Sequence, residues 1–205
     1  MALFIRSLND SPFSYSQVIS LIKTAFKQWE ETGLNSSLLK MTEEDLEKMA
    51  LARIIVVAYD SQSLDLIGTM TYSISKNNSS CYVSHLAVDP RSSGRGIATQ
   101  LYGFVLERIK KLGIAFVLSD TSVHAERSIK WHLKVGFKII GLTSFQTNNY
   151  YSYIFRHQIS HSIIWNCPLF IWSYYQISRL KTVVLLKADG TRTSIGRIVY
   201  RLFKQ

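Results

Sequence analysis

Residues 91–98, Arg-Ser-Ser-Gly-Arg-Gly-Ile-Ala, have the types and order needed to bind a phosphate group. They follow a short apolar run that ends at Asp89-Pro90, and they open a segment with apolar residues at helical spacing. A turn at a helix N-terminus directs backbone N–H groups and the positive end of the helix dipole at an anion. Gly94 and Gly96 allow close approach of that anion and a positive φ. The pattern therefore predicts a strand, a phosphate-binding turn and a helix in direct succession.

Two common phosphate-binding motifs do not fit this turn. It lacks the Gly-Lys-Ser/Thr ending of a P-loop, and its glycines are not spaced as in the G-x-G-x-x-G motif of dinucleotide-binding proteins. Instead, residues 91–98 resemble the Arg/Gln-x-x-Gly-x-Gly/Ala signature of the GNAT N-acetyltransferase superfamily. Residues 86–90 likewise resemble the Leu-Ala-Val-Asp-Pro strand end that precedes this signature. An ordinary strand-to-helix turn with convenient glycines is the alternative.

A second block supports the same resemblance. Residues 114–118 form a short apolar run typical of a strand, and residues 126–137 form a helical segment that ends in Gly136-Phe137. This segment resembles the Ser-Ile-x-x-His/Tyr-x-x-x-Gly-Phe block of the same superfamily. The two blocks occur in the expected order and at the expected separation, and the resemblance covers roughly residues 1–157.

The resemblance implies an acetyl-CoA-dependent enzyme that needs no metal ion. The implied fold is α/β, a GNAT-type mixed central sheet that is flanked by helices and splays open to admit the pantetheine arm. Backbone amides of residues 92–98 would hold the pyrophosphate, and backbone groups of residues 86–88 would bind the pantetheine. Arg91 and Arg95 are either further charges near the phosphates or solvated loop arginines. The predicted cofactor-binding residues are Leu86, Ala87, Val88, Arg91, Ser92, Ser93, Gly94, Arg95, Gly96, Ile97 and Ala98.

Two histidines are the predicted catalytic residues. His132 stands four residues before the glycine of Gly-Phe, where many GNAT enzymes have a tyrosine, and an imidazole there could protonate the departing CoA sulfur. A packed or exposed histidine without a catalytic role is the alternative. His85 is the candidate base if strand alternation places it on the cleft face, and a buried, hydrogen-bonded histidine is its alternative. Ala125 departs from the asparagine of many relatives, and neither Ser84 nor His85 is the glutamate that some use as a base.

Apolar periodicity and turn residues predict an alternation of strands and helices that would position these residues. A cap at Thr42 is expected from the Thr42-x-x-Asp45 spacing. The predicted strands are 3–8, 54–59, 66–75, 81–88 and 114–118, then a hairpin of 137–145 and 150–155, and the predicted helices are 14–30, 42–52, a long helix from 97 and a shorter one from 126.

The composition favours one domain with an extension. The chain has 205 residues and two cysteines, Cys81 and Cys167, with no C-x-x-C motif. We therefore expect neither a disulfide scaffold nor a zinc site, and we expect a reducing compartment. Residues 1–10 show no signal-peptide pattern, and a cytoplasmic protein is expected. We assign residues 1–157 to the acetyltransferase domain and residues 158–205 to a C-terminal extension.

The extension combines aromatic and basic residues. The net charge of the whole chain is +10, and between residues 160 and 205 seven lysines and arginines face a single acidic residue, Asp189. The apolar interval 157–178 contains too many polar residues for a transmembrane span. Packing on the sheet or on a second copy of the chain is one expectation for the extension, and contact with an anionic membrane at its inner face is another. Nucleic acid is a weaker alternative, because basic charge alone shows no specificity.

The expected activity is transfer of an acetyl group from acetyl-CoA to a primary amine of a small acceptor, such as an amino sugar, within a ternary complex. Two alternatives stay open. One is an acyl-CoA-binding sensor or scaffold without transferase activity, and the other is an acetyltransferase for proteins or peptides. Release of CoA in the presence of an amine distinguishes an enzyme from a binding module.

Overall fold

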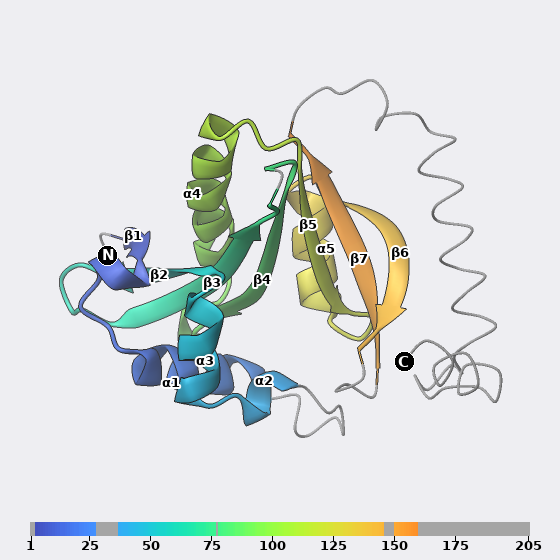
Figure 1. Cartoon of the computed structure of the whole chain (residues 1–205). Coiled ribbons are helices and arrows are strands. Elements are labelled where there is room, and N and C mark those ends of the chain that lie inside the picture. The colour runs from blue at the N-terminus through green and yellow to red at the C-terminus, as the bar shows by residue number, and fades with distance from the viewer. Residues whose placement is uncertain (1–2, 28–36, 77, 146–149, 160–205) are drawn as a thin grey trace. The chain divides into compact units, whose positions relative to one another are not determined.

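The computed structural model describes residues 3–27, 37–76, 78–145 and 150–159, and it confirms the α/β class (Figure 1). The chain divides into two compact units, Met1–Val117 and Leu118–Gln205. Strand β5 (Phe116–Ser122) carries the chain from the first unit into the second.

The first unit contains antiparallel strands in the order β1-β2-β3-β4. Strands β2, β3 and β4 form the part of this sheet that positions the phosphate-binding turn. The elements of the first unit are β1 (Leu3–Ser7), η1 (Leu8–Asp10), α1 (Tyr15–Phe26), α2 (Ser37–Lys40), α3 (Glu43–Ala50), β2 (Ile54–Asp60), β3 (Leu66–Ile74), β4 (Ser80–Val88), η3 (Pro90–Ser92) and α4 (Ile97–Lys111).

Helices cover both faces of this sheet. Ile55 and Val57 of β2 belong to one apolar cluster with residues of α1 and α3, so these helices cover that face. Side chains alternate between faces along a strand, and Gly68 of β3 lies against two side chains of α4. Helix α4 therefore covers the opposite face, and its buried residues Ile97 and Leu101 pack directly on β3.

Helices α1 and α3 begin at polar caps. The Thr42 hydroxyl accepts a bond from the Asp45 N–H at 3.2 Å, and the Thr42 N–H donates to the Asp45 carboxylate at 2.9 Å. This reciprocal pair is the predicted cap of α3. Ser14 and Gln17 form the same arrangement at the start of α1. Each cap satisfies backbone N–H groups that a helix start leaves without partners.

The second unit contains strands in the order β5-β7-β6 and one helix. Strands β6 and β7 are antiparallel, as the predicted hairpin requires. Phe137 and Phe155 are buried in this unit, and their rings surround His132 of the helix. Its elements after β5 are α5 (Glu126–Lys134), β6 (Lys138–Ser144) and β7 (Tyr151–Gln158).

Several elements differ from the predicted ones. Strand β5 begins two residues later than predicted and continues through residue 122, because its polar residues Ser119 and Ser122 are buried and hydrogen-bonded. The short helix α2 was not predicted, since four residues give no periodic pattern. The described part of the predicted helix 14–30 ends at Phe26.

The predicted extension lies almost wholly outside the described residues, because residues 160–205 are not among them. Its expected contacts with the sheet, with a second copy of the chain or with an anionic membrane stay predictions. Among the helices of the described part, none is both long enough and apolar enough to span a membrane.

Gly68 sets how closely α4 approaches β3, and this predicts an effect on stability. A Cβ at Gly68 would lie 2.8 Å from Ile97 Cγ2 and 3.0 Å from Leu101 Cδ1. Overpacking of this kind costs about 1–3 kcal/mol, so Gly68→Ala should lower the free energy of unfolding by that amount in urea denaturation.

The control is Gly103→Ala on α4, where an added Cβ meets nothing within 4 Å. Because alanine favours a helix over glycine by roughly 0.5–1 kcal/mol, this variant should be as stable as the original chain or more so. Equal stability of the Gly68→Ala variant and the original chain would show that α4 is not held by this contact.

Candidate active site

The turn between β4 and α4 has the backbone conformation that the two glycines predict. Gly94 and Gly96 both have φ of 79°, in the left-handed region that side chains disfavour. Gly96 is the N-cap of α4, whose first residue is Ile97. The N–H groups of the first helical turn have no carbonyl four residues earlier within the helix, so they are directed at the turn. This is the geometry of an anion-binding helix N-terminus.

The two glycines give the turn its backbone conformation and leave its outer surface without side chains. A Cβ at Gly94 would meet no heavy atom within 4 Å, and one at Gly96 would meet only Gln100 Nε2, at 3.9 Å. The protein itself does not crowd either position. The space beside the turn is therefore open to a bound group, and absence of side chains there lets that group reach the backbone.

Arg91 is paired with the carboxylate that ends β4. Its Nη2 lies 2.7 Å from Asp89 Oδ2, and its backbone N–H donates to Asp89 Oδ1 at 2.8 Å. The bonds from the Arg91 side chain are the main reason that the pKa of Asp89 is lowered. Asp89 has only 8% of its side chain exposed, whereas Arg91 has 86%. The pair fixes the start of the turn and leaves the outer face of the guanidinium in solvent.

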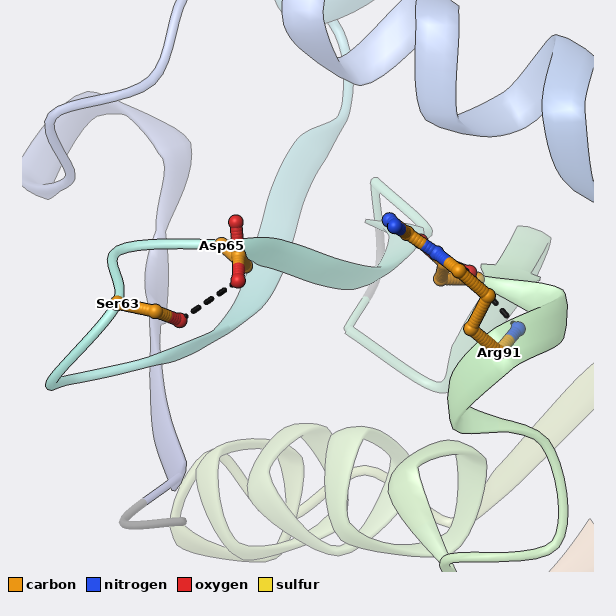
Figure 2. Close-up of polar contacts among 4 residues, drawn as sticks. Ser63, Asp65 and Arg91 are labelled. Carbon is orange, nitrogen blue, oxygen red and sulfur yellow. Dashed lines mark hydrogen bonds and ion pairs between the residues drawn. The ribbon is translucent and has the colours of Figure 1, made fainter.

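A shallow groove of about 190 Å³ lies beside the turn. Figure 2 shows Ser63 and Asp65 on the β2–β3 loop and Arg91 beyond them; the Ser63 hydroxyl donates to Asp65 at 2.7 Å. Three carboxylates and two guanidinium groups line the groove, so its charge does not complement a phosphate. The complementarity for phosphate lies in the backbone of the turn. The groove residues are Asp60, Ser63, Asp65, Ile67, Asp89, Arg91, Ser92 and Arg95.

Strand β4 contains a β-bulge immediately before the turn. Thr71 of β3 is paired with Ser84, but Thr69 is paired with Ala87, so two residues of β4 lie opposite one residue of β3. These two residues are His85 and Leu86, and His85 has φ of 51°. A bulge interrupts the ladder and redirects a side chain, and a positive φ at histidine is uncommon enough to indicate a local constraint. No residue type in this strand signals the bulge.

His85 belongs to a hydrogen-bonded cluster of polar side chains. Its Nδ1 lies 2.8 Å from Thr71 Oγ1 and 2.9 Å from Ser84 Oγ, and the tautomer decides which atoms donate. Arg53 Nη1 donates to Ser84 Oγ at 2.8 Å. Desolvation, and then the positive charge of Arg53, lower the pKa of His85 to about 4. The imidazole is therefore neutral at physiological pH.

His132 lies in the second unit, and both of its ring nitrogens are engaged. Nδ1 lies 2.8 Å from the Ser128 carbonyl oxygen and must donate to it, which leaves Nε2 to accept from the Ser119 hydroxyl at 2.9 Å. The ring is 3% exposed and stacks on Phe155 with centroids 4.4 Å apart. Desolvation lowers its pKa to about 4. These contacts are those of a packed histidine, and the predicted role as a general acid stays a prediction.

The structure brings most of the predicted residues together on consecutive elements. Residues 86–88 end β4, residues 91–96 form η3 and the turn, and residues 97–98 begin α4. The sequence did not single out Arg53 or Thr71, because their proximity to His85 depends on pairing between distant segments. Among the described residues, no group of three or more histidine, cysteine, aspartate or glutamate side chains is arranged to hold a metal ion.

The fold is shared with known acetyltransferases. PaiA N-acetyltransferase from Thermoplasma acidophilum, solved with coenzyme A, is 19% identical with a TM-score of 0.60, over 78% of this chain and 100% of that one. The ribosomal-protein-S18-alanine N-acetyltransferase from Escherichia coli is 12% identical with a TM-score of 0.62, over 78% and 96%. An aminoglycoside 6'-N-acetyltransferase, also with coenzyme A, is 18% identical with a TM-score of 0.59, over 78% and 99%.

No curated protein sequence matches the chain significantly. The model of the acetyltransferase (GNAT) family, however, matches residues 16–137, which is more than half of the chain and includes the turn and α5. This match and the fold confirm the resemblance seen in the sequence, and the chain belongs to the GNAT family of acetyltransferases.

Proposed function

We propose that this acetyltransferase binds acetyl-CoA at the turn between β4 and α4 and transfers the acetyl group directly to a primary amine of a small acceptor. The left-handed conformation of Gly94 and Gly96 at the N-terminus of α4 is the observation that carries this proposal. Backbone amides from Gly94 into the first turn of α4 form a donor set suited to a pyrophosphate. The N–H groups of Ser92 and Ser93, which the sequence predicted as further donors, instead bond the carbonyl oxygens of Asp89 and Pro90 at 2.8 and 3.2 Å. Residues 86–88 offer β4 backbone to the pantetheine.

The chemistry requires a deprotonated amine. Acetyl-CoA supplies a thioester, and a C–N bond to the acetyl carbon forms as the C–S bond breaks and the sulfur leaves with the electron pair. His85 is the proposed base. In the tautomer whose Nδ1–H donates to Thr71 or Ser84, Nε2 keeps its lone pair for the proton of the amine, and among the described residues Nε2 has no partner. Because its pKa is about 4, this imidazole is neutral at pH 7 and its lone pair is unprotonated, although the same low pKa makes it a weak base.

For the departing sulfur, the predicted acid is His132. Its Nδ1–H is held by a carbonyl and its Nε2 accepts from Ser119, so the neutral ring has no donor to spare. This bonding favours a packing role, in which His132 joins α5 to β5. Kinetics of a variant at this position separate the two roles.

Gly96→Ala should weaken binding of acetyl-CoA. Alanine in the left-handed region costs about 1–2 kcal/mol, and its methyl group would obstruct the open side of the turn, so the Kd measured by isothermal titration calorimetry should rise about tenfold or more. Gly113→Ala is the matched control: its φ is 70°, an added Cβ meets nothing within 4 Å, and it lies beyond the other end of α4. Similar changes in Kd for the two variants would contradict binding at the turn.

His85→Asn should lower kcat while leaving the Kd of acetyl-CoA nearly unchanged. Asparagine tolerates a positive φ, and its amide can retain the contact that Nδ1 makes with Thr71 and Ser84, whereas it removes the atom in the position of Nε2. Loss of a general base costs roughly 10²–10⁴-fold. Release of CoA is measured against a panel of primary amines, amino sugars included. An unchanged kcat would exclude His85 as the base, and tight binding of CoA without release by the original chain would indicate a binding module.

His132→Phe tests the packing role through pH. The pKa of His132 is about 4 in the folded chain and 6.5 for the free side chain, so the unfolded chain binds a proton first as pH falls. The neutral His132 therefore makes its full contribution to the free energy of unfolding above pH 6.5. This contribution, about 3 kcal/mol, is lost as pH falls toward 4. Urea unfolding between pH 7 and 4 should show a smaller loss for the variant. A kcat that falls more than tenfold, with a changed pH–rate profile, would restore the acid role.

A further inference from the structure

Arg53 places a positive charge beside the β4 bulge, and no carboxylate of the described residues forms an ion pair with it. It lies between α3 and β2, and its backbone N–H donates to the Met49 carbonyl oxygen at 3.0 Å, so the end of α3 fixes its position. Its guanidinium lies over the Tyr82 ring, with Cζ 5.8 Å from the centroid, and Nη1 donates to Ser84 Oγ. Backbone and ring contacts thus hold the side chain on β4.

The remaining N–H groups of this guanidinium have no partner among the described residues. Four other cations of the described part do have carboxylate partners: Arg91 pairs with Asp89, and Lys48, Lys110 and Lys130 each pair with a glutamate on the same helix. Arg53 is half-buried rather than extended into water. Since a partly desolvated cation is costly unless it is paired, the free edge of this guanidinium is a site for an anion.

The free edge lies close to the proposed base. Ser84 Oγ is 2.8 Å from Arg53 Nη1 and 2.9 Å from His85 Nδ1, so one hydroxyl joins the guanidinium to the imidazole. Thr71 is paired with Ile55, which places the cluster on the sheet face covered by α1 and α3. Helix α4, whose N-terminus forms the proposed donor site, packs on the opposite face.

We propose that Arg53 binds an anionic group of the acceptor, a carboxylate or a phosphate, and so selects amines that carry one. The inference rests on the proposed function and names its substrate class. A guanidinium can bind either group through two parallel N–H···O bonds, which orients the rest of the molecule. The positive charge also disfavours an ammonium nearby, so the amine beside His85 is held more readily in its neutral, reactive form.

The test compares two pairs of amines, and in each pair only one member carries an anionic group besides the amine. One pair is an amino acid and its carboxamide, and the other is an amino sugar phosphate and the unphosphorylated amino sugar. For the original chain, kcat/KM should be at least tenfold higher for the anionic member of one pair, mainly through KM, and the pair that shows it identifies the anion. Arg53→Gln should remove this preference, because it lowers kcat/KM for the anionic member at least tenfold more than for the neutral member. Arg53→Lys keeps the charge but loses the two parallel N–H donors, so its preference should lie between those of the original chain and Arg53→Gln.

Arg108→Gln is the matched control. Arg108 is exposed on α4 with its Cζ 4.4 Å from the centroid of Phe104, so the control removes the same charge and a similar ring contact elsewhere. It should keep the preference of the original chain. No preference in the original chain, or an equal loss for both members in Arg53→Gln, would overturn the proposal.

A binding measurement separates this proposal from the proposed function. The probes are a sugar phosphate and a carboxylate that correspond to the two anionic amines but lack the amino group. Their binding is measured by calorimetric titration, which requires no turnover. The original chain should bind one of them at least tenfold more tightly than Arg53→Gln does. Absence of such a difference overturns the role of Arg53 even if neutral amines are acetylated, whereas a difference without CoA release from any amine refutes the transferase proposal alone.

Discussion

The close packing of α4 on Gly68 determines where the N-terminus of the helix lies, and the proposed acetyl-CoA site depends on that position. Ile97, the first residue of α4, lies against Gly68 on β3. One residue away, the Ile67 carbonyl oxygen accepts a bond from the Asp89 N–H at 2.9 Å, which fixes the end of β4. Both ends of the turn are therefore tied to adjacent residues of β3, and the chain must reverse direction within residues 90–96. Two glycines in the left-handed region make that reversal possible.

His85 and His132 show that a shifted pKa alone does not identify a catalytic group. Desolvation lowers the pKa of both to about 4. Their surroundings differ, because His132 has partners on both ring nitrogens, whereas His85 has them on Nδ1. The position of His85 on a bulge with a positive φ is also strained, while His132 occupies a regular helix. Strain and a free nitrogen distinguish a group available for chemistry from one that completes a core.

The parts of the molecule that the sequence predicted are those fixed by local interactions. The Gly94 and Gly96 turn, the start of α4 and the Thr42 cap each depend on residues within a few positions of one another. The bulge at His85 depends instead on the register between β3 and β4, and no nearby residue type indicates it. The predicted strand 114–118 follows the apolar run, whereas β5 spans Phe116–Ser122 and continues beyond that run. Its later residues are polar, and Ser119 finds its partner in α5.

The same difference between local and long-range interactions explains why the sequence indicates the acetyl donor but not the acceptor. The proposed site for acetyl-CoA consists mainly of backbone groups of one continuous segment, so a short motif suffices to indicate it. The cluster proposed to face the acceptor joins Arg53, Thr71 and His85, which come from three separate segments and meet only in the folded sheet. Its specificity rests on side-chain charge and not on backbone shape. Changes at Arg53 could therefore alter the acceptor without disturbing the turn, and a family that keeps one donor can serve many amines by varying such positions.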